Sequence, residues 1–434
     1  SEVEGADVIV LNTCSVREKA EQKLRSEAGK LKKADAVLVV AGCVAQQEGE
    51  SLVKAMPFVD VVVGPDNLSE LPALVREAEL GAAPAVRTVF DLDSPRFLTN
   101  SVSPGSVGAS AYVTVMKGCD ERCSFCIVPY TRGPERYRPA DEVVSEVRSL
   151  VENGAREVVL LGQTVNSYLD PGVALAADRD PDESQFPELL GRIAREATGL
   201  DRLRYTSPHP RHLTTSLIRA HAELDVLTAH VHMPVQSGSD RMLKRMIRRY
   251  TRAEYVARVE ALKKARADVT LTTDVIVGFP GETADDFAAT LSLVREVGFV
   301  MLYGFKYSPR PHTPALKLVD DVPEAEKQSR LLALLELADA QTRAHLASLV
   351  GTRAQVLLEG PSKPGASTVA GRTRRNEIVH VPPIEGAVAG AIVDVEVVRA
   401  NKHSLEGRID RVRREAPARV SPTWRRVALP VVNA

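Results

Sequence analysis

The stretch of the chain that decides its fold reads Lys117-Gly118-Cys119-Asp120-Glu121-Arg122-Cys123-Ser124-Phe125-Cys126. It holds three of the five cysteines in the spacing C-x3-C-x2-C, directly after the apolar run 112–116. Three thiolates on one short loop can bind three irons of a 4Fe–4S cluster, because cysteine sulfur is the usual ligand of such clusters. With no fourth cysteine nearby, the fourth iron stays open. An open iron can chelate the amino and carboxylate groups of S-adenosylmethionine and pass an electron to its sulfonium.

Other interpretations of this loop are weaker. A structural zinc site usually has four ligands in paired spacing, and the nearest histidine, His209, is far along the chain. A disulfide with one spare thiol is unusual in a chain with so few cysteines. Phe125 suits an apolar cover over a cluster, although packing at the rim of the fold explains it as well. The sequence therefore predicts an open cluster on Cys119, Cys123 and Cys126.

The composition is that of an ordinary globular protein. A length of 434 residues implies two or three domains, and 44% apolar with 26% charged residues allow a sizeable core. The net charge of −1 excludes a uniformly basic nucleic-acid binder, so any RNA contact must come from local patches. There is no apolar run of about 18 residues for a membrane span and no visible signal peptide. Because unpaired cysteines suit a reducing compartment, we expect a cytoplasmic protein without membrane contact.

Residues 1–80 alternate strands and helices, which predicts a parallel sheet between helices. Cys14 and Cys43 each follow a strand directly, and the ligands of such sheets collect at the carboxyl ends of the strands. Two buried structural cysteines are an equal alternative on composition alone. Residues 81–110 form a connection with a short strand expected near Val89-Phe90. The expected strands are 7–11, 36–40 and 59–63, and the expected helices are 16–33 and 46–56.

Residues 111–348 repeat the βα pattern six times, which predicts a partial (βα)6 barrel with active residues on the loops after the strands. A surface insertion is expected at 170–185. The expected strands are 112–116, 157–161, 203–206, 230–235, 271–277 and 301–307. The expected helices are 141–152, 186–196, 213–221, 251–265, 284–297 and 323–348. The polar or glycine-bearing loops that face the same mouth as the cysteines are 162–164, 207–210, 236–240 and 278–283.

Residues 349–412 show only strand patterns and predict a small all-β barrel, and 413–434 predict a disordered tail. The strands expected in the barrel are 354–358, 377–381, 391–398 and 405–409. Two basic clusters stand out on a chain with almost no charge bias. Most such clusters are simply solvated, but local patches can also neutralise RNA phosphates. The clusters are Arg241, Lys244, Arg245, Arg248 and Arg249 near the barrel mouth, and Arg372, Arg374 and Arg375 in the β barrel.

Several further side chains have two interpretations. The loop 278–283 follows a strand, and its glycines would let a flat ligand such as adenine approach the backbone, but Thr283 with Asp286 also explains it as a helix start. His209 and His232 suit proton transfer near pH 7 but are more often structural. Arg132 and Arg138 are placed to bind a carboxylate or phosphate, with solvated surface charge as the equal alternative.

The C-x3-C-x-Phe-C spacing resembles the signature of radical S-adenosylmethionine enzymes, and nearly the whole chain resembles the methylthiotransferase family among them. Members of that family join a cysteine-bearing α/β domain, a radical barrel and a C-terminal TRAM domain that binds RNA. The segment Cys14-Ser15-Val16-Arg17-Glu18-Lys19 is similar to the MiaB-type tRNA branch. The other segments that carry the resemblance are 11–13, 42–47, 119–133, 234–239 and 274–283.

The resemblance implies the chemistry. One S-adenosylmethionine would donate a methyl group to sulfur at a second, N-terminal 4Fe–4S cluster, and another would be cleaved at the first cluster to a 5′-deoxyadenosyl radical. The radical enables methylthio to replace hydrogen at carbon 2 of isopentenyl-adenosine beside the anticodon, an unactivated position that needs a radical cofactor. The implied partners are tRNA, an electron donor such as flavodoxin or ferredoxin, and a sulfur donor. Alternatives are methylthiolation of threonylcarbamoyl adenosine or a ribosomal protein, and a non-catalytic RNA-binding iron–sulfur protein.

The resemblance also implies ligand residues. S-adenosylmethionine contacts are expected from the loops with Gln236-Ser237 and Gly278-Phe279-Pro280. They are also expected from Gln163, which stands where many radical enzymes carry Gly-Gly-Glu, so that the methionyl amino group would be held either by Gln163 or by backbone carbonyls. The second cluster is expected on Cys14, Cys43 and a third cysteine in an early Gly-Cys-Gln segment. That segment is absent here. We expect an N-terminally truncated chain, a misassigned start or an incomplete auxiliary cluster, and hence cleavage of S-adenosylmethionine with poor methylthio transfer.

Overall fold

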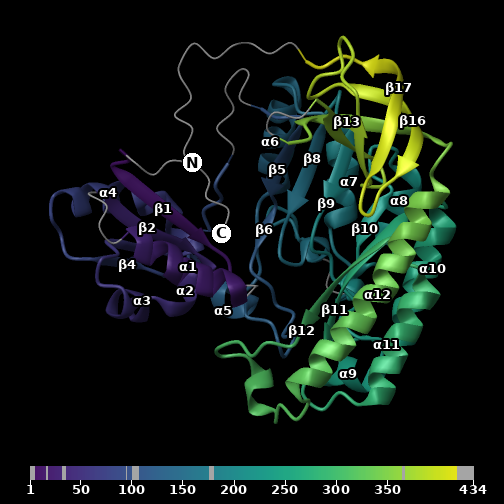
Figure 1. Cartoon of the computed structure of the whole chain (residues 1–434). Helices are drawn as coiled ribbons and strands as arrows, with labels where there is room; N and C mark the ends of the chain where they lie inside the picture. Colours follow the sequence, from purple (N-terminus) through teal and green to yellow (C-terminus); the bar gives the residue numbers. More distant parts are fainter. Residues whose placement is uncertain are drawn as a thin grey trace.

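The computed structural model describes residues 5–15, 18–31, 36–93, 95–99, 107–174, 180–363 and 367–417. Figure 1 shows three bodies in these ranges: an N-terminal α/β layer, a central partial barrel and a small C-terminal β barrel. The disordered tail predicted for 413–434 begins inside a strand that ends at Arg414, and residues 418–434 lie outside the described ranges. No described helix is both long enough and apolar enough to cross a membrane.

The N-terminal body is a parallel sheet in the order β1-β2-β3-β4. Helices cover both faces, because Leu38 and Val40 pack in one apolar cluster with α1 and α3 while Val39 and Ala41 pack in another with α4. A strand buried on both faces needs an unbroken apolar run, which β2 and β3 have. The elements are β1 (Val8–Thr13), α1 (Glu18–Leu31), β2 (Val37–Gly42), α2 (Cys43–Glu48), α3 (Glu50–Ala55), β3 (Val61–Val63), η1 (Pro65–Glu70), α4 (Leu71–Glu79) and β4 (Ala85–Arg87).

Two details differ from the sequence prediction. The helix expected over 46–56 is two short helices, because the chain turns at Gly49, where φ is 50°. The strand expected near Val89-Phe90 lies at Ala85–Arg87, where it pairs with β3. Val89 itself is exposed, and its amide donates to the Asn67 side chain at 3.0 Å instead of to a neighbouring strand.

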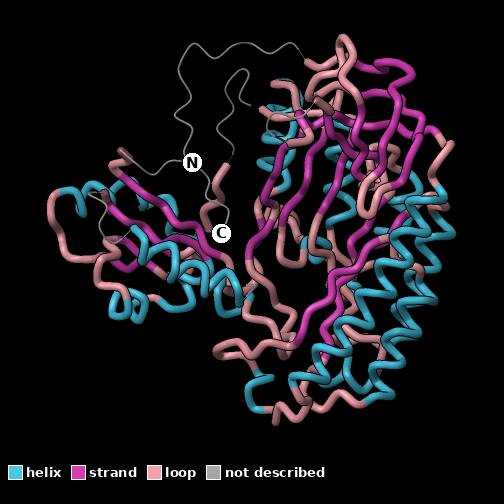
Figure 2. Tube along the Cα trace, viewed as in Figure 1, coloured by secondary structure: helices cyan, strands magenta, loops and turns pink. Residues whose placement is uncertain are grey.

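The central body contains the six expected strands in two parallel sheets, β5-β8-β9 and β10-β11-β12. An isolated bridge joins Leu203 to Leu227, which precedes β10 in the chain, and the helices pack on the outside (Figure 2). The strands are β5 (Ser110–Thr114), β8 (Glu157–Leu161), β9 (Arg202–Tyr205), β10 (His230–His232), β11 (Thr270–Val277) and β12 (Met301–Lys306). The other elements are α6 (Ala140–Glu152), η2 (Val165–Ser167), α7 (Phe186–Glu196), η3 (Pro210–His212), α8 (Thr215–Glu223), α9 (Asp240–Arg245), α10 (Arg252–Ala265), α11 (Ala284–Val297), η4 (Pro314–Lys317) and α12 (Glu324–Ser348).

Strand ends in the central body differ from the prediction for local reasons. The strand expected over 230–235 stops at His232, because Pro234 has no N–H to donate to a neighbouring strand. The helix expected from Leu213 begins at Thr215, because the Thr214 side chain caps it. The strand expected over 112–116 ends at Thr114, after which the chain turns into the ribbon that carries the cysteines.

The C-terminal body is a closed barrel in the order β13-β14-β15-β17-β16, so the predicted fold class is confirmed. The sequence patterns miss β14, because its central Gly371 weakens the strand signal. That glycine is required, since a Cβ there would lie 2.3 Å from the Leu357 carbonyl oxygen. The strands are β13 (Arg353–Pro361), β14 (Val369–Thr373), β15 (Ile378–Val381), β16 (Ile392–Ala400) and β17 (Leu405–Arg414).

The C-terminal barrel packs against the amino ends of the central strands, away from α5 (Val128–Arg132) (Figure 1). Arg202 is the first residue of β9 and is fully buried. Its guanidinium donates to the main-chain carbonyls of Arg372 at 2.7 Å and Gln355 at 3.1 Å. From the other side of the interface, Arg374 donates to the Leu227 carbonyl at 3.1 Å. The two bodies therefore share a hydrogen-bonded, partly buried interface.

Candidate active site

A two-stranded ribbon holds the three-cysteine loop. β6 (Met116–Lys117) pairs antiparallel with β7 (Arg136–Tyr137), and the loop between them contains the short helix α5 (Val128–Arg132). Gly118 starts the loop with φ at 79°, and a Cβ there would lie 1.9 Å from the Pro134 carbonyl oxygen. Only glycine fits this position, so the residue before Cys119 sets the path of the loop.

Cys119, Cys123 and Cys126 line one cavity of about 160 Å³ at the carboxyl ends of the barrel strands. A second cavity, of about 810 Å³, adjoins it. The side chains that line both are Phe125, Cys126, Val128, Gln236 and Asp274. The other residues that line the smaller cavity are Glu121, Gln163, Thr164, Ser207, Pro208, His209, His232, Pro234 and Arg248. The structure therefore brings the cysteines together with the loops after β8, β9 and β10, as the barrel prediction requires.

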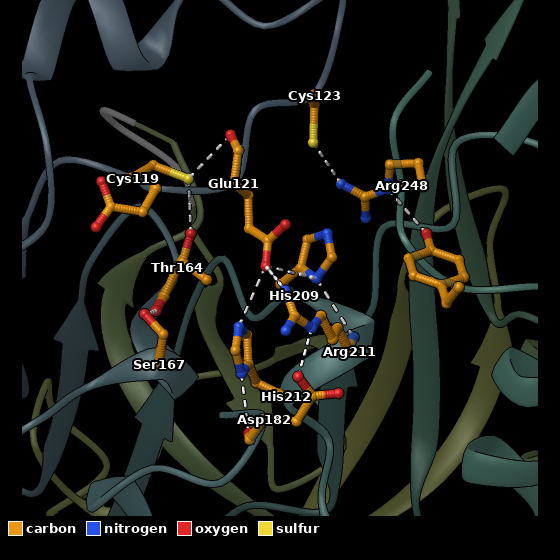
Figure 3. Close-up of polar contacts among 12 residues, drawn as sticks. Cys119, Glu121, Cys123, Thr164, Ser167, Asp182, His209, Arg211, His212 and Arg248 are labelled. Atoms are coloured by element: carbon orange, nitrogen blue, oxygen red, sulfur yellow. Dashed lines mark hydrogen bonds and ion pairs between the residues drawn. The ribbon is translucent and has the colours of Figure 1, made fainter. Parts of the chain in front are cut away.

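Cys119 and Cys123 are buried and Cys126 is half-buried, in a partly polar setting. The Cys119 sulfur lies 2.9 Å from Thr164 Oγ1, and the Cys123 sulfur accepts a hydrogen bond from Arg248 at 3.3 Å (Figure 3). Burial raises the pKa of Cys119 and of Cys126 to about 12. Thiols with such pKa values become thiolates near neutral pH only when a cation binds the sulfur, as a metal does.

The donor set fits an iron–sulfur cluster. Three cysteines on one loop can each bind a different iron of a cube, and the fourth iron then faces the cavity. Within the described ranges no group of three or more His, Cys, Asp or Glu residues is placed to hold one metal ion. The three cysteines line the wall of the same cavity.

Gln163 lines the smaller cavity but has a structural partner. Its side-chain oxygen accepts the N–H of Gly118 at 2.7 Å and so ties the loop after β8 to the cysteine loop. The rest of the amide is an NH2 group, which donates and cannot accept. The amino group of S-adenosylmethionine would therefore have to share an oxygen that already accepts from Gly118, which weakens the prediction that Gln163 binds it.

Gln236 and Ser237, predicted together as cofactor contacts, are separated by the structure. Gln236 lines both cavities and has a left-handed backbone, with φ at 70°. Ser237 is fully buried, and its hydroxyl lies 3.2 Å from that of Thr290 on α11. Gln236 thus keeps a ligand-facing position, whereas Ser237 faces a helix.

The loop with Gly278 and Phe279 does not line either cavity. Phe279 is fully buried, and its ring meets the Tyr307 ring edge-on at 5.1 Å inside an apolar cluster. A Cβ at Gly278 would lie 2.3 Å from the Lys327 side chain, so this glycine makes room for α12. The prediction of direct S-adenosylmethionine contacts is not supported for these two residues.

The same holds for Pro280, whose carbonyl accepts from the Arg245 guanidinium at 3.0 Å. Thr283 and Asp286 form a reciprocal cap at the start of α11. This cap supports the helix-start interpretation of Thr283 and Asp286.

A charged network lies beneath the cysteine loop. One carboxylate oxygen of Glu121 lies 3.3 Å from His212 Nε2 and 3.4 Å from Arg211 (Figure 3). Burial opposes ionisation of Glu121, but the hydrogen bond from His212 and the charges of His212, Arg211 and Arg249 outweigh it and lower its pKa. Burial likewise opposes protonation of His212, but its bond to Glu121 raises its pKa. Burial holds the pKa of His209 well below its ordinary value, so this ring is neutral near pH 7.

The two N-terminal cysteines lie side by side. Thr13 of β1 and Gly42 of β2 are paired in register, so Cys14 and Cys43 leave the sheet at the same edge. Cys14 is exposed and Cys43 is buried. Ser15, next to Cys14, lines the larger cavity, so this edge of the sheet faces the barrel mouth.

The segment of β6, the three-cysteine loop, α5 and β7 contacts the N-terminal body. Arg132, at the end of α5, donates to the Cys43 sulfur at 3.3 Å, which differs from the anion contact or solvated charge considered for it. Asp66 pairs with Arg136 of β7 and with Lys117 of β6, the latter at 3.2 Å. The segment that carries Cys119, Cys123 and Cys126 is therefore also the main polar link to the N-terminal sheet.

Two other predicted side chains, Arg138 and His232, contact other residues of the protein. Buried Arg138 pairs with Glu142 and Glu146, so it is not solvated. His232 contacts Asp274 at 3.3 Å, which supports a structural role beside the cavity.

The arginines predicted to contact RNA also have partners. Arg372 pairs with Glu359 at 3.2 Å, Arg375 pairs with Glu377 at 3.1 Å, and Arg374 donates to carbonyls of the central barrel. A phosphate would have to displace these contacts, so this geometry does not favour the prediction.

Sequence reasoning missed the roles of Glu121, Thr164 and Arg248. Arg248 was grouped with four other basic residues near the mouth, yet it is buried against Cys123 and the Pro234 carbonyl. The only signal for Glu121 is its position, since an acidic residue between two cluster cysteines places a negative charge beside the cavity.

Comparison with known proteins agrees with the geometry. A model of the radical SAM superfamily matches residues 113–294, a model described as uncharacterized protein family UPF0004 matches 1–64, and a TRAM domain model matches 347–409. A radical S-adenosylmethionine methyltransferase from Kitasatospora setae shares the fold, with a TM-score of 0.52 at 18% identity over 71% of this chain and 64% of that one. The three-cysteine loop at the mouth of a partial (βα)6 barrel thus defines a radical S-adenosylmethionine enzyme.

Relatives with similar sequences show which family of radical S-adenosylmethionine enzymes the chain belongs to. A tRNA-2-methylthio-N(6)-dimethylallyladenosine synthase of Sorangium cellulosum is 61% identical, over 99% of this chain and 92% of the relative. Its namesake in Acidithiobacillus ferrooxidans is 44% identical, over 98% and 91%. The chain belongs to the family of tRNA-2-methylthio-N(6)-dimethylallyladenosine synthases.

Proposed function

We propose that this chain methylthiolates carbon 2 of N6-isopentenyl (dimethylallyl) adenosine beside the tRNA anticodon. Two S-adenosylmethionine molecules are consumed, one as methyl donor and one as radical source. The observation that carries the proposal is the loop of Cys119, Cys123 and Cys126, which faces a cavity that opens into a larger one. The names of the relatives supply the substrate.

In this proposal Cys119, Cys123 and Cys126 hold the first 4Fe–4S cluster. The cluster supplies the electron for reductive cleavage of S-adenosylmethionine. The protein keeps the loop in shape through Gly118 and donates a hydrogen bond to the Cys123 sulfur from Arg248. Apolar side chains beside the cysteines limit access of water, which would otherwise quench a reactive species.

The larger cavity is where the modified adenosine fits best. Its wall combines the rings of Phe125, Tyr303 and Tyr307 with the aliphatic side chain of Ile276. Aromatic rings stack on nucleobases, and the apolar surface suits an isopentenyl chain. Because Cys126 lines both cavities, a base placed here lies next to the cluster loop.

Cys14 and Cys43 supply two thiolates toward the second cluster. They leave adjacent strands at one edge, beside the larger cavity, so sulfur bound there would lie near the nucleoside. A cube with one open iron needs three protein ligands, and the residues present offer two cysteines. Further partners in this proposal are tRNA held in part by the C-terminal barrel, a flavodoxin- or ferredoxin-like electron donor and a sulfur donor, all in the cytoplasm.

Mass spectrometry of tRNA nucleosides tests the function. Deleting the gene is expected to remove 2-methylthio-N6-isopentenyl adenosine and leave N6-isopentenyl adenosine in its place. Loss of the methylthio form of threonylcarbamoyl adenosine, or of a methylthio group on a ribosomal protein, would instead assign a different substrate. Unchanged nucleosides and ribosomal proteins would contradict a methylthiotransferase.

Replacement of Cys14 and Cys43 by alanine is expected to separate the two half-reactions. The sulfur site loses its ligands, so methylthio product should fall to background while 5′-deoxyadenosine still forms from S-adenosylmethionine. Liquid chromatography measures the amounts of methylthio product and 5′-deoxyadenosine in one assay. Cysteine-to-alanine changes that leave methylthio product unchanged would remove both residues from the reaction.

Arg248→Met is expected to make the first cluster harder to reduce. Removing a positive donor from the Cys123 sulfur destabilises the more negative, reduced state. A hydrogen bond to a charged group contributes about 1.5 kcal/mol or more, so the midpoint potential should fall by roughly 60 mV for one electron. Redox titration followed by electron paramagnetic resonance measures it. Arg248→Lys keeps the charge and should shift the potential less, and equal potentials in all three proteins would contradict this role.

A further inference from the structure

The C-terminal barrel carries a hollow of about 480 Å³ where β13, β16 and β17 lie side by side (Figure 1). Three cross-strand neighbours line it, namely Gln355 of β13, Asp394 of β16 and Arg411 of β17. The other residues that line it are Arg353, Ala354, Asp410 and Arg413. Three arginines therefore meet in one hollow of this barrel.

These arginines are exposed and keep hydrogen-bond donors for a ligand. The side chains of Arg353, Arg411 and Arg413 are 81%, 66% and 50% exposed. Each contacts a carboxylate through Nε: Arg411 and Arg413 share Asp394 at 2.6 and 2.9 Å, and Arg353 lies 3.2 Å from Asp410. Within the described ranges the terminal NH2 groups of the three guanidiniums make no hydrogen bond. An anion in the hollow would thus find donors that are already in place.

The charges of the hollow also favour an anion. Three arginines face two carboxylates, so one positive charge remains uncompensated. Exposed ion pairs contribute little to stability, so an incoming anion can displace a carboxylate at small cost. Arg374 differs in this respect, because it donates to main-chain carbonyls of the central barrel from a partly buried position.

The lining of the hollow indicates which anion fits. The planar guanidinium matches the oxygens of a phosphate, to which it can donate two parallel hydrogen bonds. The lining contains no aromatic and no large apolar side chain, so a nucleobase has nothing to stack on. Contacts of this kind bind the phosphate backbone of a nucleic acid and do not distinguish its bases. The larger cavity at the barrel mouth has the opposite character, with three aromatic rings in its wall.

The hollow lies far from the cysteine loop. Its residue Gln355 accepts the guanidinium of Arg202 through its main-chain carbonyl, so the hollow borders the interface with the amino ends of the central strands. The cysteines line a cavity at the opposite, carboxyl ends. β11 has eight residues, Thr270–Val277, and at about 3.3 Å per residue it spans about 26 Å. An RNA that reaches both places must therefore extend well beyond the modified nucleoside.

We infer that Arg353, Arg411 and Arg413 bind backbone phosphates of tRNA at a part of the molecule distant from the modified adenosine. This assignment rests on the proposed function, which supplies tRNA as the partner. It places the RNA contact of the C-terminal barrel on β13 and β17 and not on Arg372, Arg374 and Arg375.

The test measures binding of whole tRNA with N6-isopentenyl adenosine to the full chain over a range of salt concentrations. The variant is Arg411→Gln with Arg413→Gln. The matched control is Arg399→Gln with Arg408→Gln, which removes as many charges from the same barrel. The control arginines are also exposed, but each already donates from a terminal nitrogen, to Glu406 and Glu396 respectively.

The Arg411/Arg413 variant is expected to weaken tRNA binding at least about tenfold, because two sets of charge-assisted hydrogen bonds to phosphate are lost. The slope of log K against log salt should become shallower by about 1–2, since each lost phosphate contact contributes about 0.9. The control should weaken binding less than about threefold and keep the slope of wild type. Fluorescence anisotropy of labelled tRNA gives both quantities, and melting temperatures show that the variants fold.

Equal losses in the variant and the control would mean a general effect of charge and would contradict a phosphate site in the hollow, as would an unchanged affinity and slope. Inorganic phosphate is the second probe: a variant that loses phosphate binding but keeps its tRNA affinity would assign the hollow to a free phosphate compound instead of RNA. If the double variant does not fold, Arg353→Gln at the most exposed of the three positions decides, with an expected slope change of about 0.9. Failure of wild type to bind tRNA would overturn the proposed function itself, a different outcome from a wild type that binds and a variant that matches it.

Discussion

Replacing Cys119, Cys123 and Cys126 with alanine is expected to abolish reductive cleavage of S-adenosylmethionine. The three sulfurs line one cavity and leave one iron of a cube without a protein ligand. Without these three ligands the cluster does not bind, so 5′-deoxyadenosine should not exceed the level seen without enzyme. Each single change leaves two thiolates and should give the same loss. Anaerobic reconstitution, iron analysis and chromatography of the products under dithionite measure the effect.

The double variant that lacks Cys14 and Cys43 is the matched control. It removes two sulfurs, as a double change in the loop would, but these two lie at the edge of the N-terminal sheet. We expect it to keep the loop cluster and the cleavage reaction. Cleavage that persists in the triple variant would contradict the assignment of the loop, whereas equal loss in triple and double variants would mean that the two sites depend on one another.

Local pattern determines the parts of the fold that the sequence predicts well. The valine runs of β2 and β3 indicate a sheet buried on both faces, and the structure covers both faces with helices. The spacing of Cys119, Cys123 and Cys126 indicates one loop with three sulfurs on one cavity, and the structure has this arrangement. These features depend on residues that are near each other in the chain, so periodicity and spacing are sufficient.

The roles of single side chains on irregular segments cannot be predicted in this way. Arg248 and Arg249 are adjacent in the chain, yet Arg248 is buried against the Cys123 sulfur and Arg249 is exposed. The backbone there leaves helical geometry, with φ at 57° for Ile247 and 52° for Arg249, so no periodicity tells which arginine turns inward. Phe279 is a second example, because a glycine-flanked loop gives no indication that its aromatic ring packs into the core.

Contacts between distant segments are the other part that sequence could not supply. The strand with Arg202 and Arg204 carries two charges and would be expected to expose them, but both are buried at the end of the central barrel that meets the C-terminal barrel. Arg204 pairs with Glu157 at 3.2 Å, and Arg202 reaches carbonyls of the C-terminal barrel. Pairing between residues this far apart in the chain leaves no local signal. For the same reason, the hydrogen bonds of Arg374 to the central barrel could not be predicted from the sequence.

Arg374→Ala is expected to loosen the C-terminal barrel from the central one. The substitution removes guanidinium bonds to the carbonyls of Asp201, Asp225 and Leu227, which Arg374 donates from a partly buried position. Hydrogen bonds to charged groups contribute about 1.5–3 kcal/mol each at most, so the melting temperature should fall by roughly 5–10 °C. Calorimetry of the full chain measures it. The exposed ion pair of Arg408 offers the control on the same barrel, and Arg408→Ala should change the melting temperature by no more than about 2 °C.

A cut before residue 349 should have a larger effect than Arg374→Ala. The last turn of α12 carries Leu346 into the core of the C-terminal barrel, and fully buried Arg202 would lose both of its carbonyl partners there. The cut exposes to water the surface that the C-terminal barrel covers, Leu346 included, so residues 1–348 should unfold at a lower temperature or aggregate, and cleavage of S-adenosylmethionine should fall with them. A cut chain that melts like the full one, with tRNA affinity as its only loss, would mean that the two barrels are independent and that Arg372, Arg374 and Arg375 are available to RNA.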